Sequence, residues 1–187
     1  MANKRIEDLI FAKVKGRVDG FRGLKAQAGF MPSAQYEGQA GNGTPVAYVA
    51  AIQEYGDPSH GIPPRPFMRK ASSDNREEWV QSIKRGLREV VRGGMAPDAA
   101  LEAVGGVMAA DIQGAIAAVD SPPLSPVTLM LRGMRQANPN LVVTGRTVGE
   151  AAAKVAAGDD PGAVSTKPLV DTGYLLASVT HRVGKSK

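Results

Sequence analysis

The stretch EYGDPSHGIPPRPF, residues 54–67, constrains the fold of this chain more than any other segment. Four prolines and two glycines fall within residues 56–66. Proline lacks an amide donor, fixes φ and pushes the preceding residue towards extended geometry, so the stretch excludes regular helix and central strand. Because it ends in the large apolar residues Phe67 and Met68, we expect a stiff, extended arm fixed at both ends. Such an arm either presents residues to a partner or rigidly connects two elements.

Two charged residues of this arm stand out. Arg65 lies between two prolines, and Glu54 lies beside the glycine that ends the preceding helix. We expect Glu54 to anchor the arm, for instance to Arg65, and Arg65 to matter more for assembly than for stability of the monomer. The residues expected to dock on a partner are Glu54, Tyr55, Gly56, Ile62, Pro63, Pro64, Arg65, Pro66 and Phe67.

Length, charge and cysteine content set the broad class. A chain of 187 residues fits a single domain, residues 1–187, and its net charge of +5 permits an acidic or nucleic-acid partner. The absence of cysteine excludes disulfides, thiol catalysis and cysteine-ligated metals. Charges at Glu7 and Asp8 interrupt what a signal peptide would need, and no stretch approaches the ~18–20 apolar residues of a membrane span. We therefore expect no export and no membrane partner.

The N-terminal part of the chain predicts a helix followed by a β-hairpin. Apolar residues at three- and four-residue steps indicate an amphipathic helix over residues 4–21. Strict alternation predicts a half-buried strand over residues 24–30. A second strand near residues 33–39 and the hairpin signal Asn42-Gly43 complete an expected β-hairpin arm over residues 24–44.

Two helices are predicted on either side of the proline arm. Thr44-Pro45 opens the first, and Gly56 stands where a left-handed C-terminal cap belongs. Asp74 with Glu77 resembles a capping box at the start of the second. The buried stripe of that second helix is predicted from Trp79, Val80, Ile83, Leu87, Val90 and Val91.

The C-terminal half predicts three further helices and a final strand. A long helix rich in alanine and glycine starts at Pro97, and a shorter one over residues 124–132 starts with Ser125 as its N-cap. Residues 147–157 are predicted to be helical but weakly apolar, within a peripheral or poorly ordered insertion over residues 137–166. Residues 175–183 begin as helix and finish as strand, and residues 184–187 form a disordered tail. The predicted class is α+β, a small antiparallel sheet packed by several helices, with a β-hairpin arm and a stiff proline-rich loop.

Few residues are suited to catalysis or metal binding. The two histidines, His60 and His181, have no metal ligands at useful spacing, and no cofactor or metal is expected. Glu54 and Asp171 are the best-placed carboxylates, but no constellation supplies both a nucleophile and a base. We therefore expect that the protein is not an enzyme. An enzyme acting through Glu54 or Asp171 is the alternative, in which alanine at either residue abolishes function and leaves assembly intact.

Three local signatures occur in order along the chain: EYG followed by IPPRPFMRKA, then SPPLSPVTLMLRG, then KPLVDTGYLLASV. Their order and residues resemble the tail-completion, or head–tail joining, proteins of tailed double-stranded-DNA bacteriophages. That group includes minor tail and virion-morphogenesis proteins. Besides the arm, the matching residues are Pro122, Pro123, Leu124, Ser125, Thr128, Lys167, Pro168, Leu169, Asp171, Thr172, Gly173, Leu176 and Ser178.

The resemblance implies a structural role in the virion. It implies a ring of six copies at the neck, between the head-side connector or stopper and the tail terminator or tube. DNA would pass through the ring without its sequence being recognised. The protein would be assembled in the cytoplasm of the host bacterium. The segment 137–166 departs from the family pattern, which puts the identity of the outer partners in doubt.

Two alternatives to the neck role remain. The protein could keep a virion role as the head-side connector or the tail terminator. It could instead bind nucleic acid through the basic faces of its first two long helices, although acidic residues and few aromatics count against this. Salt-dependent affinity for DNA would support nucleic-acid binding, and salt-insensitive association with proteins would support the joint.

Overall fold

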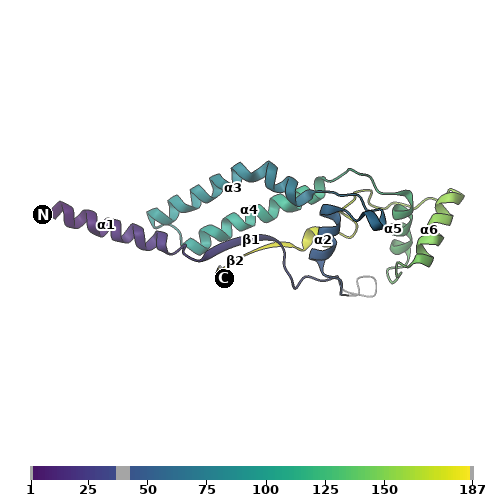
Figure 1. Ribbon diagram of the computed structural model, residues 1–187, viewed down its shortest axis with the longest axis horizontal. Helices are drawn as coiled ribbons and strands as arrows, with labels where there is room; N and C mark the ends of the chain where they lie inside the picture. The colour runs from purple at the N-terminus through teal and green to yellow at the C-terminus, as the bar shows by residue number, and fades with distance from the viewer. Residues whose placement is uncertain (1, 37–42, 186–187) are drawn as a thin grey trace. The chain divides into compact units, whose positions relative to one another are not determined.

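The computed structural model describes residues 2–36 and 43–185. The fold is α+β, and in the described residues helices predominate over a small two-stranded antiparallel sheet (Figure 1). The elements in chain order are α1 Ala2–Asp19, β1 Leu24–Phe30, α2 Val46–Tyr55, the 3-10 turn η1 Pro58–His60, α3 Phe67–Arg92, α4 Pro97–Ala118, α5 Pro126–Ala137, α6 Gly145–Ala157, α7 Tyr174–Ala177 and β2 Val179–Lys185.

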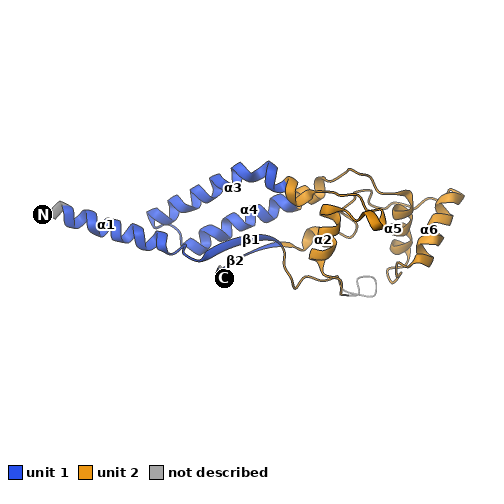
Figure 2. Ribbon diagram, in the orientation of Figure 1, with its two compact units in different colours: residues 1–29, 71–112, 180–187 blue, residues 30–70, 113–179 orange. Residues whose placement is uncertain are grey.

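The chain forms two compact units (Figure 2). Unit 1 comprises residues 1–29, 71–112 and 180–187, and unit 2 comprises residues 30–70 and 113–179. Each unit is assembled from separate stretches, so neither corresponds to one continuous half of the sequence. The expectation of a single domain over residues 1–187 stays a prediction.

Unit 1 is built around α3 and α4, whose small residues allow close packing. An added Cβ at Gly86 of α3 would lie 3.1 Å from the Cβ of Ala100 on α4. Trp79 Nε1 donates a 2.6 Å hydrogen bond to Asp111 Oδ2, which joins the same two helices. The small residues of α4 therefore allow another helix to pack closely against it, as its alanine- and glycine-rich composition predicts.

The sheet pairs the first strand with the last. β1 and β2 are hydrogen-bonded neighbours, and Arg182 of β2 donates to Gln27 Oε1 of β1. The prediction of a regular strand over residues 33–39 is wrong for the described part, where one antiparallel bridge joins Gln35 and Pro45. Residues 37–42, the tip of the predicted hairpin, lie outside the described residues.

The C-terminal predictions have mixed outcomes. Residues 174–185 form a short helix and then a strand, as the change of periodicity predicts. β2 extends to Lys185, so the expected disordered tail is wrong for residues 184 and 185. Residues 186–187 lie outside the described residues.

Helix α3 differs from its prediction at its start and on one face. It begins at Phe67, upstream of the predicted capping box at Asp74 and Glu77. Of the predicted buried stripe, Val80, Ile83 and Leu87 are 41%, 48% and 40% exposed. The predicted stripe therefore combines residues from two apolar faces of α3. Other residues of unit 1 cover only one of these faces.

Helix α4 is, among the described residues, the one helix long and apolar enough by length and composition to cross a membrane. The expectation that no stretch approaches a membrane span is therefore too strong. Its Val104 and Ile116 are 4% and 0% exposed, and the same helix carries Asp111. Core helices of soluble proteins pass the same test, so length and hydropathy alone do not identify a membrane span.

Unit 2 encloses the ends of the proline arm and the segment predicted as an insertion. Phe67 is fully buried, and its ring meets that of Phe30 edge to face with centroids 6.1 Å apart. Helix α6 packs on α5 and buries Ala151 completely. Within residues 137–166, helix α6 is thus packed on α5, and the expectation of a peripheral or poorly ordered insertion otherwise stays a prediction.

Candidate functional site

The proline arm starts at a glycine that no other residue could replace without strain. Gly56 ends α2 with φ 79° and ψ 170°, so it is not the left-handed cap that its position suggests. A Cβ there would lie 2.8 Å from the carbonyl oxygen of Ile62 and 2.9 Å from the nitrogen of Pro64. The chain therefore turns tightly at this point, because only glycine combines positive φ with such close approach.

The first part of the arm is a closed loop rather than an extended segment. The amides of Asp57 and Ile62 each donate to the other's carbonyl, at 2.8 and 2.9 Å. Within the loop, Asp57 accepts hydrogen bonds from Ser59 and contacts His60 Nδ1 at 2.6 Å. These bonds, that from Ser59 above all, hold the pKa of the Asp57 carboxyl below its usual value.

Glu54 anchors the end of the arm, but its partner is not Arg65. Its carboxylate accepts from the amides of Met68 and Arg69, at 2.8 and 3.2 Å, and from Arg69 Nε at 2.8 Å. It thereby satisfies free amides of the first turn of α3, a capping role supplied from another helix. This tertiary cap explains why α3 begins without the predicted local capping box.

Arg65 is buried and faces its own unit. Its Nε and Nη2 donate to the Pro122 carbonyl at 3.1 and 3.0 Å, and its Nη1 donates to Gln53 Oε1 at 3.2 Å. Burial, and secondarily the charge of Arg132, lower the pKa of its guanidinium. A residue 5% exposed with these contacts supports the monomer, and the expectation that Arg65 matters more for assembly stays a prediction.

Arg132 of α5 joins the second and third signatures. Its Nη1 donates to the carbonyls of Ser165 and Lys167, and its Nη2 donates to that of Pro168 at 3.2 Å. Its Nε lies 3.5 Å from Asp171 Oδ1. Burial lowers the pKa of this guanidinium, an effect that Asp171 opposes. One side chain thus shapes the whole KPLVD turn.

A cavity of about 560 Å³ lies in unit 2 beside this turn. The Tyr36 and Tyr174 rings meet at its edge with centroids 5.0 Å apart. Arg135 Nη1 reaches Asp171 Oδ2 at 3.4 Å in the wall. The lining residues are Tyr36, Thr44, Val49, Gln53, Arg132, Arg135, Pro168, Leu169, Asp171, Thr172, Gly173, Tyr174 and Leu175.

The structure sorts the predicted docking residues into three groups. Gly56, Ile62 and Pro63 are half-buried. Glu54, Arg65 and Phe67 are buried anchors, whereas Tyr55, Pro64 and Pro66 are exposed. Docking on a partner stays a prediction, and it concerns the exposed group. Of the other signature residues, Pro168 and Leu169 are buried, and Pro123, Lys167, Asp171 and Thr172 are exposed.

Sequence reasoning missed the residues that tie the signatures together. These residues are Gln53, Arg69, Arg132 and Arg135. Arg132 carries a usable signal, because it is a charge within the apolar run LMLRGM of an amphipathic helix. Such a charge on a packed face must find acceptors, although sequence cannot say which.

The carboxylates considered for catalysis are engaged in structural contacts. Glu54 caps α3, and Asp171 lies between Arg132 and Arg135. Among residues 2–36 and 43–185, no three histidine, aspartate or glutamate side chains cluster as a metal site would require. These contacts can hold the backbone around Glu54 and Asp171 in place and so present the exposed residues beside them on the surface. Comparisons with protein-family models, curated proteins and solved structures give no match.

Proposed function

We propose that the protein is a structural component of the neck of a tailed bacteriophage virion, where it completes the tail and joins it to the DNA-filled head. In this proposal several copies form a ring around the DNA channel. The head-side connector or stopper lies on one side of the ring and the tail terminator or tube on the other. The resemblance of the three signatures to tail-completion proteins is the starting point.

The observation that carries the proposal is that the three signatures come together in unit 2. Arg65 of the first signature binds the Pro122 carbonyl of the second. Arg132 of the second binds the carbonyls of Lys167 and Pro168 in the third. The three signatures thus occur in the order of the family and are also connected to one another by hydrogen bonds. This supports a shared structural role better than three separate sequence similarities would.

The exposed side of the arm suits the docking role that the proposal requires. Tyr55 is 69% exposed, and the Arg69 guanidinium lies over its ring at 5.1 Å from the centroid. The buried side chains of Glu54, Arg65 and Phe67 anchor the arm to unit 2. An arm that is already ordered loses little conformational entropy when it binds, which favours a stable joint.

Electron microscopy of particles made without this protein tests the proposal. DNA-filled heads and finished tails that remain separate, and that join when purified protein is added, would support the neck role. Normal virions would contradict it. Missing or overlong tails would move the protein to the tail side of the particle.

A matched pair of variants tests the arm within the same add-back experiment. Tyr55→Ala removes the exposed ring next to the arm, and we expect it to join few or no particles. Tyr48→Ala serves as control, because Tyr48 is 60% exposed at the other end of α2. Equal joining by both variants would contradict docking through the arm, whatever the position of the protein in the virion.

A further inference from the structure

Two adjoining cavities lie in unit 2. The larger, of about 560 Å³, lies beside the KPLVD turn, and the smaller has a volume of about 310 Å³. Four residues line both cavities: Arg132, Arg135, Asp171 and Thr172. They form the wall that the two cavities share, so the double cavity formed by the pair extends in two directions from Arg135.

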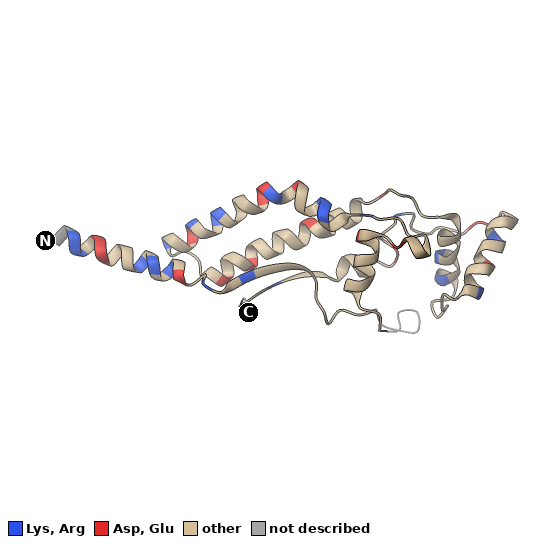
Figure 3. Cartoon of the chain, in the orientation of Figure 1, with Lys and Arg blue, Asp and Glu red and all other residues tan. Residues whose placement is uncertain are grey.

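The shared wall carries two positive charges and one negative charge. Asp171 lies 3.5 Å from Arg132 Nε and 3.4 Å from Arg135 Nη1. Both distances exceed the length of a charge-assisted hydrogen bond, which is about 2.7–2.9 Å. Helix α5 supplies both arginines and has no acidic residue (Figure 3). One carboxylate therefore neutralises the two guanidiniums incompletely.

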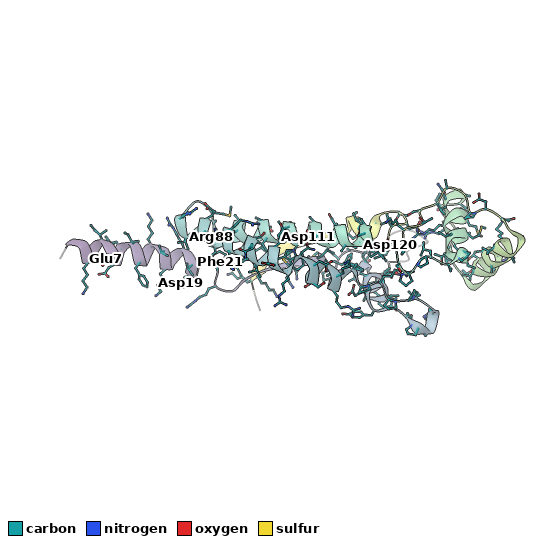
Figure 4. The ribbon with its side chains drawn as sticks, turned by 90° about the horizontal axis from the view of Figure 1, so that it is seen from above. Glu7, Asp19, Phe21, Arg88, Asp111 and Asp120 are labelled. Atoms are coloured by element: carbon teal, nitrogen blue, oxygen red, sulfur yellow. The ribbon has the colours of Figure 1, made fainter. Side chains whose placement is uncertain are left out.

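Other carboxylates of unit 2 do not complete the neutralisation. Glu54 accepts from the first turn of α3, and Glu150 and Asp159 pair with basic residues of α6. Asp120 (Figure 4) follows the C-terminal end of α4 and lines neither cavity. Among the described residues, Asp171 is the one acidic residue that lines the double cavity. The wall thus has an excess of positive charge, which suits an anionic ligand.

Two groups on the larger cavity have unused hydrogen-bond donors. Within the described residues, the guanidinium of Arg135 contacts Asp171 and makes no other hydrogen bond, so its Nε and Nη2 are free to donate. Tyr36 Oη has no partner there either, whereas the neighbouring Tyr174 hydroxyl donates to the Gln35 carbonyl at 2.6 Å. Burial and Tyr174 raise the pKa of the Tyr36 hydroxyl, and smaller opposing effects of Arg135 and Asp171 place that hydroxyl near both charges.

The rest of the larger cavity is mainly apolar. Its lining includes Val49, Leu169 and Leu175, of which the two leucines are 5% and 6% exposed. The Tyr36 and Tyr174 rings add an aromatic edge, with centroids 5.0 Å apart. Apolar and aromatic walls with a few placed polar groups are typical of ligand sites. The cavity therefore suits a ligand that carries an anionic group next to an apolar one.

We propose that the double cavity binds an acidic side chain in an extended segment of a partner protein. The aspartate or glutamate carboxylate accepts hydrogen bonds from Arg135 and Tyr36, and an apolar side chain of the same segment packs on Leu169. When the carboxylate binds Arg135, Asp171 keeps its contact with Arg132. The acidic residue lies within the partner chain rather than at its end, because the double cavity extends in two directions from Arg135.

The proposal goes beyond the neck role, which supplies only a biological setting. Binding of an acidic segment is a property of the purified chain and needs no virion. The site also differs from the exposed side of the proline arm, since neither Tyr55 nor Arg69 lines it.

Selection of random short peptides on the purified full chain tests the proposal. The peptides are displayed between neutral linkers, so none has a free terminal carboxylate. We expect the enriched sequences to carry aspartate or glutamate beside an apolar or aromatic side chain, and we expect Arg135→Ala to enrich none of them. Arg146→Ala, which removes an 88% exposed side chain from α6, is the matched control and should select like wild type.

Titration calorimetry with one selected peptide then measures the role of each group. Arg135→Ala should weaken binding about tenfold or more, and so should an amide in place of the peptide's carboxylate. Tyr36→Phe removes one neutral donor and should weaken binding about threefold. Circular dichroism verifies that each variant is folded.

Asp171→Asn should change the affinity in the opposite direction. Asp171 competes with the ligand for Arg135, so its neutral variant should bind the acidic peptide several times more tightly than wild type. An ion pair that only held the turn in place would not produce this gain. Loss of affinity in a folded Asp171→Asn variant would contradict the proposed competition.

Three further results would overturn the proposal. They are no enrichment on wild type, equal enrichment on Arg135→Ala, and tighter binding of a free C-terminal carboxylate than of an internal acidic residue. Failure of the neck function alone would look different. Purified protein would then bind the selected peptides as described but would not join separated heads and tails.

Discussion

The Arg65 guanidinium donates two hydrogen bonds to the carbonyl oxygen of Pro122, a residue 57 positions later in the chain. A third bond reaches Gln53 Oε1 at 3.2 Å. The proline arm is therefore fixed in unit 2 by one buried cation with backbone and amide acceptors. Every buried side-chain nitrogen and oxygen in the described part of the chain has a hydrogen-bond partner, so the loss of this cation would break a complete network.

Arg65→Ala should lower the free energy of unfolding by about 2–3 kcal/mol, because hydrogen bonds to charged groups contribute about 1.5–3 kcal/mol and their acceptors would stay buried. Chemical denaturation followed by circular dichroism measures the change. Arg146→Ala removes an 88% exposed side chain from an ion pair on α6 and should change stability by less than about 0.5 kcal/mol. A similar small loss at Arg65 would contradict the anchoring role.

Arg132→Lys should loosen the turn from residues 165 to 171 although the charge is kept. The guanidinium reaches carbonyls of Ser165, Lys167 and Pro168 from two nitrogens, and a single ammonium cannot reproduce this planar fork. We expect a loss of about 2 kcal/mol. Amide hydrogen exchange should accelerate more in residues 165–171 than in α2 when the variant is compared with wild type. Equal protection of residues 165–171 in the variant and in wild type would contradict this role of Arg132.

The ion pair of Glu54 with Arg69 should contribute less than the capping bonds of the same carboxylate. Arg69 is 59% exposed, so the pair is worth about 1 kcal/mol or less. Glu54→Ala also uncaps the amides of Met68 and Arg69, which adds a further ~1 kcal/mol or more. A double-mutant cycle with Arg69→Ala measures the pair separately. A coupling energy equal to the whole Glu54→Ala effect would rule out the capping role.

Local sequence patterns predicted some elements of the structure correctly. Alternation predicted β1 at residues 24–30 with its observed bounds, and Ser125 caps α5 by accepting from the Thr128 amide. The start of α3 could not be predicted in this way. Its cap, Glu54, belongs to another helix, and tertiary contacts of this kind have no local pattern.

The candidate site shows the same division between local and distant contacts. The prolines and Gly56 correctly placed a constrained loop at residues 56–66, and Phe67 is its buried end. The partner of Arg65 could not be identified, because a backbone carbonyl such as that of Pro122 carries no sequence signal. The exposed face of α3 was also missed, since helical periodicity locates apolar faces and does not say which of them is covered.

Stability should fall above about pH 10, partly through Tyr36. Burial, with an added contribution from Tyr174, raises the pKa of the Tyr36 hydroxyl above its usual 10.0. A raised pKa in the folded state stabilises fully below the unfolded value, and this contribution is lost as the pH rises through the folded value. Denaturation at several pH values should show a shallower decline for Tyr36→Phe than for wild type. Tyr55→Phe, at a 69% exposed position, should keep the wild-type decline.

Gly133 of α5 and Gly149 of α6 should respond to alanine with opposite signs. A Cβ at Gly133 would overlap the carbonyl oxygen of Pro161, so α5 or the segment over it must shift. Such overpacking costs about 1–3 kcal/mol. Gly149 has nothing within 4 Å of an added Cβ, so alanine should stabilise by about 0.5–1 kcal/mol through helix propensity.

Thermal unfolding of the two alanine variants therefore tests whether residues 158–167 pack on α5. A lower midpoint for Gly133→Ala together with a higher one for Gly149→Ala is the expected result. If both variants were stabilised, Pro161 would not lie against α5, and the segment would be the loosely attached insertion that the sequence suggests. Truncating Pro161 to Gly in the Gly133→Ala background leaves the carbonyl in place but frees the backbone. It should recover part of the loss only if the close contact exists.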